Sequence, residues 1–232
     1  MNTNAEAVRD NWIAQTERIR TCTLRAGRPE GSVKLVAVSK THPGSAIEAL
    51  LPGGQRDFGE SYVQELRAKM DALPSDVRWH FIGHLQSNKA RQIAGQVHLI
   101  HSVDRSSLLA ALAGTRQDIL LQVNVSGETT KSGCRPDEVR ALLAQARSMA
   151  DIRVRGLMTM APQSDDPEHA RPHFRALATL AADIRHELSQ LDSDESALFT
   201  ELSMGMSHDL EPAIEEGATL VRIGTAIFGE RA

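Results

Sequence analysis

Short apolar runs alternate with helical patterns along almost the whole chain. The runs are rich in Val, Ile, Leu and Phe and lack strict polar alternation, which is typical of strands in a parallel sheet covered on both faces. The pattern predicts strands over residues 34–40, 56–60, 79–83, 99–103, 119–124, 154–159, 199–204 and 220–225. It predicts helices between them over residues 44–51, 61–73, 87–94, 106–113, 136–149, 167–191 and 209–216.

The order of these elements predicts the fold class. Eight strands in one series, each followed by a helix or by the end of the sequence, indicate an α/β protein with a single (β/α)8 TIM barrel. A doubly wound open sheet is the alternative. It usually has fewer strands, and no Gly-x-Gly-x-x-Gly fingerprint follows the first strand here.

An additional helix is expected before the first strand, over residues 4–26. Val8, Trp12 and Ile19 share one face of it by helical spacing. The polar stretches 161–167 and 190–197 are interpreted as loops of the βα series, because no linker-like composition divides the chain. We therefore expect residues 1–232 to form a single domain.

Composition narrows the class of protein. The chain has 232 residues, of which 41% are hydrophobic, and its net charge of −4 gives no basic surface for nucleic acid. The N-terminus lacks a signal peptide, and no apolar stretch reaches the ~20 residues that a membrane span needs. Cys22 and Cys134 lack metal-ligand spacing, so we expect reduced thiols. The expectation is a cytoplasmic monomer that binds neither nucleic acid nor membrane.

Lys40 is the first candidate for chemistry. It closes the most strand-like run of the chain, and side chains at the carboxyl ends of barrel strands meet at the mouth where such proteins keep their sites. A partly desolvated amine there, with a depressed pKa, is a natural Schiff-base former.

The last two βα units suggest a phosphate site. Residues 203–209 form a small-residue turn before a helix that Ser207 or Asp209 can cap, and Gly224-Thr225 follows the last strand with an accessible backbone. Barrels often bind phosphate between the loops after strands seven and eight. An N-cap and a strand-ending glycine are the structural alternatives for each feature taken alone.

Arg222, His84 and Met158 complete the set at the mouth. Arg222 lies two residues before Gly224 and so shares its face of the strand, where a buried arginine requires a partner or ligand. His84 follows strand three, and Met158 ends strand six as core or pocket lining, with Met160.

Other candidates are weaker. His80 and His84 have the i, i+4 offset of a zinc motif, but they span a strand and a turn and have no evident carboxylate partner, so no metal is expected. Lys89, early in a helix, and Lys131, in a polar loop, are expected to be solvated charges.

Taken together, these residues resemble the pyridoxal 5′-phosphate homeostasis proteins, the YggS/PROSC family. The resemblance extends from strand one to the end of the chain. It rests on the stretches LVAVSK at 35–40, FGE at 58–60, WHFIGHLQSNK at 79–89, GLMTM at 156–160, LSMGMS at 202–207 and RIGTAIFG at 222–229.

The resemblance implies a barrel like the N-terminal domain of alanine racemase, with pyridoxal 5′-phosphate held on Lys40 as an internal aldimine. It implies that Ser207, Gly224 and Thr225 bind the phosphate and that Arg222 meets the pyridine nitrogen. The family commonly has Asn after Gly-Glu, whereas this chain has Ser61, so no binding role is carried onto Ser61.

The expected activity is binding rather than catalysis. A cationic Arg222 disfavours the ring-nitrogen proton that makes the cofactor an electron sink, and racemisation needs a second base facing Lys40. In alanine-racemase-like enzymes, a tyrosine of a second domain supplies this second base. This sequence ends soon after strand eight, and its one tyrosine is Tyr62. A non-catalytic cofactor binder that delivers pyridoxal phosphate to apo-enzymes is therefore predicted. A small racemase and a Schiff-base aldolase are the alternatives.

Overall fold

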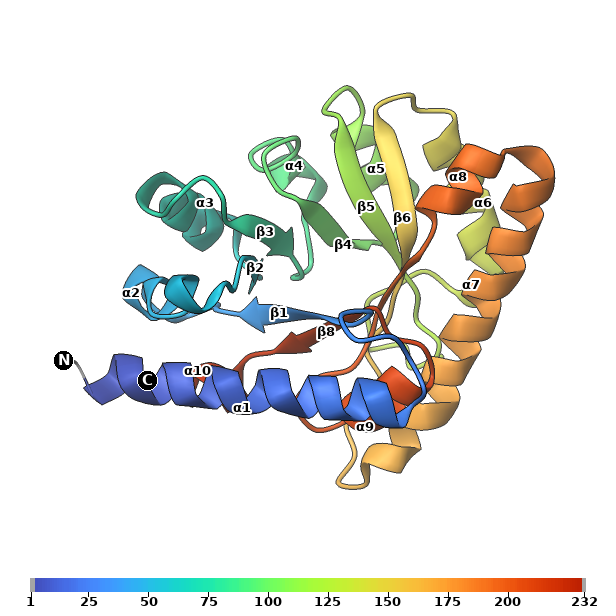
Figure 1. Ribbon diagram of the computed structural model, residues 1–232. Helices are drawn as coiled ribbons and strands as arrows, with labels where there is room; N and C mark the ends of the chain where they lie inside the picture. Colours follow the sequence, from blue (N-terminus) through green and yellow to red (C-terminus); the bar gives the residue numbers. More distant parts are fainter. Residues whose placement is uncertain (1–2, 231–232) are drawn as a thin grey trace.

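Each predicted apolar run forms a strand in the computed structural model, which describes residues 3–230 (Figure 1). The strands are β1 Lys34–Val38, β2 Asp57–Glu60, β3 Arg78–Phe81, β4 Leu99–Val103, β5 Gln117–Gln122, β6 Ile152–Met158, β7 Glu201–Ser203 and β8 Leu220–Ile223. Every neighbouring pair is parallel, and β8 pairs with β1 to close the barrel. The predicted (β/α)8 barrel is therefore confirmed.

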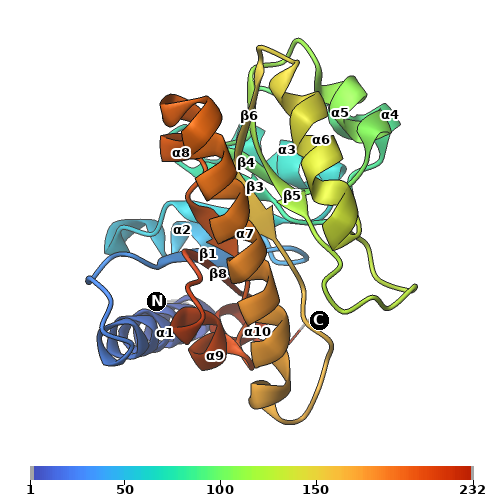
Figure 2. The same ribbon diagram turned by 90° about the vertical axis from the view of Figure 1, so that its right-hand side faces the viewer.

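The helices surround this barrel. They are α1 Thr3–Arg25, α2 Gly44–Glu48, α3 Val63–Ala72, α4 Ser87–Ala90, α5 Ser106–Leu112, α6 Val139–Arg147, α7 Arg171–Leu191, α8 Ser193–Leu198, α9 Leu210–Glu215 and α10 Thr225–Phe228. Three 3-10 turns, η1 Leu51–Gly53, η2 Pro136–Glu138 and η3 Pro167–Ala170, join them. The long α7 runs along the outside of the barrel beside β6 and α8 (Figure 2). Among residues 3–230, no helix combines the length and apolar character needed to cross a membrane.

Two groups of buried side chains form the core. The larger one lies between strands and helices and includes Phe58, Leu108 and Phe174. The smaller one draws one residue from each of five strands, Val36, Leu99, Leu120, Met158 and Leu220, and fills the barrel interior. Burying aliphatic surface on both sides of each strand explains why the strands read as continuous apolar runs.

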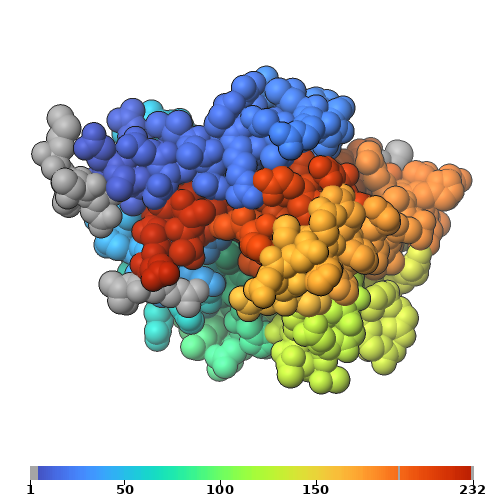
Figure 3. Space-filling view, turned by 90° about the horizontal axis from the view of Figure 1, so that it is seen from below, coloured from blue at the N-terminus to red at the C-terminus, as the bar shows by residue number. Residues whose placement is uncertain are grey.

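The predicted additional helix is α1, and it covers the last βα units. It packs against α9 and α10, so the first and last helices lie side by side (Figures 1 and 3). The Asn11 amide donates to the Ile227 carbonyl oxygen at 3.1 Å, and Trp12 Nε1 donates to Gln55 Oε1 at 3.0 Å. Helix α1 is thus part of the packed structure next to the barrel mouth.

Some predicted boundaries were wrong. Strand β1 ends at Val38 rather than at 40, and β8 ends at Ile223, because Gly224 turns the chain (φ −115°, ψ −82°) into α10. The stretch 190–197, interpreted as a loop, contains the start of α8. Asp192 caps this helix by accepting hydrogen bonds from the amides of Asp194 and Glu195.

Candidate cofactor site

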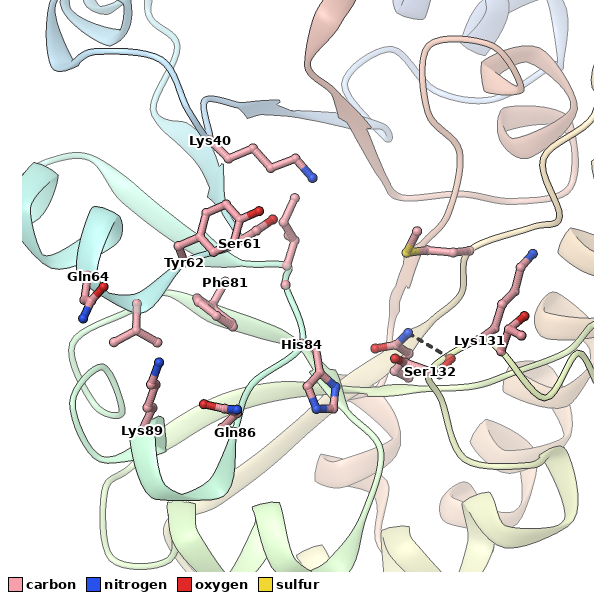
Figure 4. A pocket seen from close by; sticks show the side chains of 16 residues that line it. Lys40, Ser61, Tyr62, Gln64, Phe81, His84, Gln86, Lys89, Lys131 and Ser132 are labelled. Carbon is pink, nitrogen blue, oxygen red and sulfur yellow. Dashed lines mark hydrogen bonds between the residues drawn. The ribbon is translucent and has the colours of Figure 1, made fainter. Parts of the chain in front are cut away.

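The carboxyl ends of the strands enclose a cavity of about 670 Å³ at the barrel mouth. Lys40 and His84, two of the predicted site residues, line it together with Ser61, Tyr62, Lys89 and Lys131 (Figure 4). Side chains from β1, the β2–α3 turn, the β3–α4 segment and the 130–132 loop therefore converge on one space. Its volume falls within the range of roughly 300–1,000 Å³ that small-molecule sites usually have.

A buried ion-pair cluster fixes the backbone on both sides of Lys40. Lys69 Nζ, on α3, donates to the Ser39 carbonyl oxygen (2.8 Å) and to carboxylate oxygens of Glu60 (2.7 Å) and Glu65 (2.6 Å). The Ser39 hydroxyl donates to Glu60 Oε1 at 2.6 Å, and the Thr41 amide donates to Glu65 Oε1 at 2.6 Å. These bonds hold Thr41 at φ +68°, an uncommon conformation for threonine.

Glu60 is the central member of this cluster. Its side chain is fully buried, and burial raises its pKa despite the hydrogen bonds from Lys69 and Ser39. The sequence reasoning gave no role to Glu60 or Lys69, although one signal was present. Lys69 falls on the apolar face of α3 with Val63 and Leu66, where a lysine needs a buried partner.

The predicted phosphate-binding residues follow β7 and β8, and β8 pairs with β1, the strand that precedes Lys40. Gly224 packs against β1, where a Cβ on it would lie 3.2 Å from the Val38 carbonyl oxygen. Gly205 has φ +92°, and a Cβ there would lie 2.5 Å from the Ala213 Cβ. Gly205 therefore cannot be replaced without strain, whereas Gly224 is tightly packed against β1.

The predicted caps of α9 need correction. Asp209 occupies the N-cap position, but its carboxylate accepts the Met206 amide (2.6 Å) instead of capping the helix. Ser207 accepts a hydrogen bond at its carbonyl oxygen from Arg18 of α1 (2.9 Å). Ser207, Gly224 and Thr225 do not line the 670 Å³ cavity.

Arg222 is buried in the barrel, which excludes the alternative of a surface arginine at a strand end. It is 4% exposed, and its two terminal nitrogens donate to Ser203 Oγ (2.7 Å) and to the Thr159 carbonyl oxygen (3.0 Å). Burial lowers its pKa to about 10, with the Asp209 charge opposing that shift, so Arg222 is a cation at neutral pH. Met158, 1% exposed, belongs to the interior core.

Two predictions about secondary candidates were wrong. His80 does have a carboxylate neighbour, since its Nε2 lies 3.0 Å from Asp57 Oδ1, and Asp57, His80 and His98 gather at the amino-terminal end of the barrel. His84 instead lies at the mouth, so the two histidines do not form a pair. Lys131 is not fully solvated: its side chain is 24% exposed and its Nζ lies 3.7 Å from Glu128.

Cys22 and Cys134 are free, buried thiols, as expected.

Comparison with known proteins shows the broad class of protein to which this chain belongs. The family described as "Alanine racemase, N-terminal domain" matches residues 10–232. Alanine racemase from Corynebacterium glutamicum shares the fold, with a TM-score of 0.71 at 15% identity over 97% of this chain and 62% of that protein.

Closer relatives define the family more narrowly. The chain is 43% identical to the pyridoxal phosphate homeostasis protein of Aquifex aeolicus over 93% of this chain and 94% of that protein. It is 39% identical to the protein of that name from Escherichia coli K12, over 95% of each. A structure of PipY from Synechococcus elongatus PCC7942 with PLP bound has a TM-score of 0.76 at 39% identity, covering 90% of this chain and 98% of that one. The chain belongs to the family of pyridoxal phosphate homeostasis proteins.

Proposed function

We propose that this protein binds pyridoxal 5′-phosphate as a Schiff base on Lys40 and acts as a reservoir that buffers the cofactor and delivers it to apo-enzymes. The observation that carries the proposal is the position of Lys40, after β1 and in the mouth cavity, within a family whose member PipY has been solved with PLP bound. Condensation of the lysine amine with the aldehyde forms a carbon–nitrogen double bond and releases one water, and hydrolysis reverses it.

The donor set fits this cofactor. Lys40 offers an amine for the aldehyde, and Arg222 offers a buried cation for an acceptor nitrogen. Ser207, Gly224 and Thr225, in the loops after β7 and β8, offer amides and hydroxyls for a phosphate. The bound cofactor supplies an aldehyde and an electron-withdrawing ring. His84 and Met158 retain their predicted place in the binding set, as proposals.

The same residues favour holding over catalysis. Electron withdrawal by the ring is strongest when its nitrogen is protonated, and a cationic Arg222 beside that nitrogen opposes protonation. Reversible release needs access to water, and the cavity that Lys40 lines is not enclosed. We propose a cytoplasmic, monomeric carrier whose partners are pyridoxal phosphate and the apo-enzymes that accept it.

Visible absorbance tests the binding. We expect purified protein incubated with pyridoxal phosphate to show a yellow Schiff-base band that Lys40→Ala lacks. Lys34→Ala is the matched control, because Lys34 begins the same strand with a side chain that is 58% exposed. A wild type that takes up no cofactor, or a Lys40→Ala variant that keeps the band, contradicts the proposal.

A racemase is the second candidate, because one observation favours it. Tyr62 lines the same cavity as Lys40 and is 57% exposed, so the chain carries a hydroxyl able to approach a ligand held there (Figure 4). Incubation with single enantiomers of common amino acids separates the two functions. The carrier predicts no sustained turnover. Turnover at enzyme-like rates that Tyr62→Phe abolishes would establish the racemase instead.

A further inference from the structure

An unbroken series of hydrogen bonds crosses the barrel interior and ends on Arg222. Asp57, His80, His101, Ser203 and Arg222, which we term the interior chain, come from β2, β3, β4, β7 and β8. The links are His80 Nε2 to Asp57 Oδ1 (3.0 Å), His80 Nδ1 to His101 Nε2 (2.9 Å), His101 Nδ1 to Ser203 Oγ (2.8 Å) and Arg222 to Ser203 Oγ (2.7 Å).

All five residues are buried, with Asp57 the most exposed of them. Their exposed fractions are 8% for Asp57, 1% for His80, 0% for His101, 0% for Ser203 and 4% for Arg222. Buried polar groups in a barrel interior destabilise the fold unless each donor meets an acceptor. Five such groups in one line, where apolar layers usually fill the space, imply a role beyond packing.

The two ends of the interior chain fix the position of every proton in it. Arg222 has only donors, so Ser203 Oγ accepts from it. Among residues 3–230, the acceptor that the buried Ser203 hydrogen meets is His101 Nδ1, so Ser203 donates to that nitrogen. Burial lowers the pKa of His101 well below its usual value, so this ring is neutral and carries its proton on Nε2.

The same reasoning continues to Asp57. His101 Nε2 donates to His80 Nδ1, which leaves His80 to donate from Nε2 to the Asp57 carboxylate. Burial opposes ionisation of Asp57, but hydrogen bonds from Arg78 and His80 outweigh it and hold the pKa of Asp57 well below its usual range. Asp57 is therefore only an acceptor, and this arrangement makes all four links while leaving no hydrogen of Ser203 or of the two imidazoles without an acceptor.

We propose that the interior chain positions Arg222 in the cofactor site, through Asp57, His80, His101 and Ser203. In this arrangement both histidines are neutral Nε2–H tautomers. They keep Arg222 oriented as a cationic donor toward the ring nitrogen. The proposal rests on the proposed function, because it assigns Arg222 to the cofactor. In the reverse arrangement, His101 and Arg222 would both donate to Ser203 Oγ, and the buried Ser203 hydrogen would have no acceptor among residues 3–230. The ring nitrogen then stays unprotonated, which suits a carrier.

Nitrogen NMR of the histidine side chains in the cofactor-free protein tests the tautomers directly. We expect both His80 and His101 to show the Nε2–H pattern at neutral pH, identified by assignment with His80→Gln and His101→Gln. An imidazolium, or an Nδ1–H tautomer at either ring, would overturn the proposed arrangement. This experiment needs no cofactor, so it separates failure of the interior chain from failure of the proposed function.

Ser203→Ala tests the link to the cofactor. It removes the hydroxyl between His101 and Arg222, and we expect about tenfold weaker pyridoxal phosphate binding and a shifted ring-nitrogen resonance of 15N-labelled cofactor. His101→Gln, whose amide can accept from Ser203 and donate to His80, should restore more of the wild-type shift than His101→Phe.

Ser102→Ala is the matched control for Ser203→Ala. Ser102 is 1% exposed and neighbours His101, and its hydroxyl has no hydrogen-bond partner among residues 3–230. It should leave the cofactor spectrum unchanged. If wild type and Ser203→Ala bind the cofactor with the same affinity and the same ring-nitrogen resonance, the positioning role is wrong even though the protein binds pyridoxal phosphate.

Discussion

At the residue scale, the proposed site depends on Lys40, whose neighbours Ser39 and Thr41 are fixed by a buried ion-pair cluster. Lys69 is 7% exposed and bonds to both the strand end and two carboxylates, so the segment 39–41 has a defined path into the mouth. A Schiff-base lysine benefits from this arrangement, because a fixed backbone presents its amine to the cavity in a defined position.

The ion-pair cluster should therefore be important for stability. Lys69→Met leaves the buried Glu60 carboxylate without its cation, and we expect a loss of about 3–5 kcal/mol in the free energy of unfolding, measured by urea titration. Arg67→Met, on the exposed face of the same helix, is the control and should change little.

A double-mutant cycle identifies the cause. Combining Lys69→Met with Glu60→Gln removes both charges, so the double variant should be more stable than the sum of the two single losses predicts. Strict additivity would show that Lys69 and Glu60 do not stabilise each other.

At the element scale, α1 supports the two loops to which the phosphate site is assigned. Arg18 forms a two-point ion pair with Glu211 (2.8 and 2.7 Å) and donates to the Ser207 carbonyl oxygen, while Asn11 donates to Ile227 in α10. Bidentate arginine pairs fix geometry better than single contacts do. A helix outside the eightfold βα repeat thus contributes to the site.

Loss of this support should affect the phosphate end of the ligand selectively. We expect Arg18→Ala to weaken pyridoxal 5′-phosphate binding about tenfold and to leave binding of pyridoxal, which lacks the phosphate, nearly unchanged. Titration of both ligands by visible absorbance measures this.

Arg20→Ala is the matched control, since Arg20 is on the same helix and pairs with Glu17. Equal losses for pyridoxal and pyridoxal phosphate in Arg18→Ala would show that α1 acts on the whole barrel rather than on the phosphate loops.

At the scale of the whole molecule, the sequence was sufficient to predict the repeating βα units. It was not sufficient to predict the side-chain contacts between them. The run at 99–103 coincides with β4, and the glycine loops near Gly205 and Gly224 occur where phosphate-binding barrels place them. The interior chain was not predicted, because barrel closure brings together residues as distant in sequence as His101 and Ser203. The predicted ends of strands were wrong where contacts between distant residues decide where a strand ends. The Glu60–Lys69 contacts beside the end of β1 at Val38 are an example.

Burial of His101 should make the stability of the whole molecule depend on pH. Below about pH 6.5 the unfolded chain binds a proton at this residue, whereas the folded protein, with the pKa of His101 lowered by burial, does not. Stability should therefore fall as pH falls below that value, by up to about 1.4 kcal/mol per pH unit. Urea midpoints between pH 5 and 7.5 measure the slope, and His101→Gln should reduce it. If His101→Gln leaves the pH dependence of stability unchanged, groups other than His101 cause that dependence.

Chemical trapping of the bound cofactor tests the central claim most directly. Borohydride reduction of the protein incubated with pyridoxal phosphate converts a Schiff base into a stable amine, and peptide mass spectrometry then locates the modified lysine. The proposed function predicts one dominant adduct on the peptide that contains Lys40, formed without any added sugar phosphate. An adduct confined to Lys89 or Lys131, or no adduct on any lysine, would contradict it.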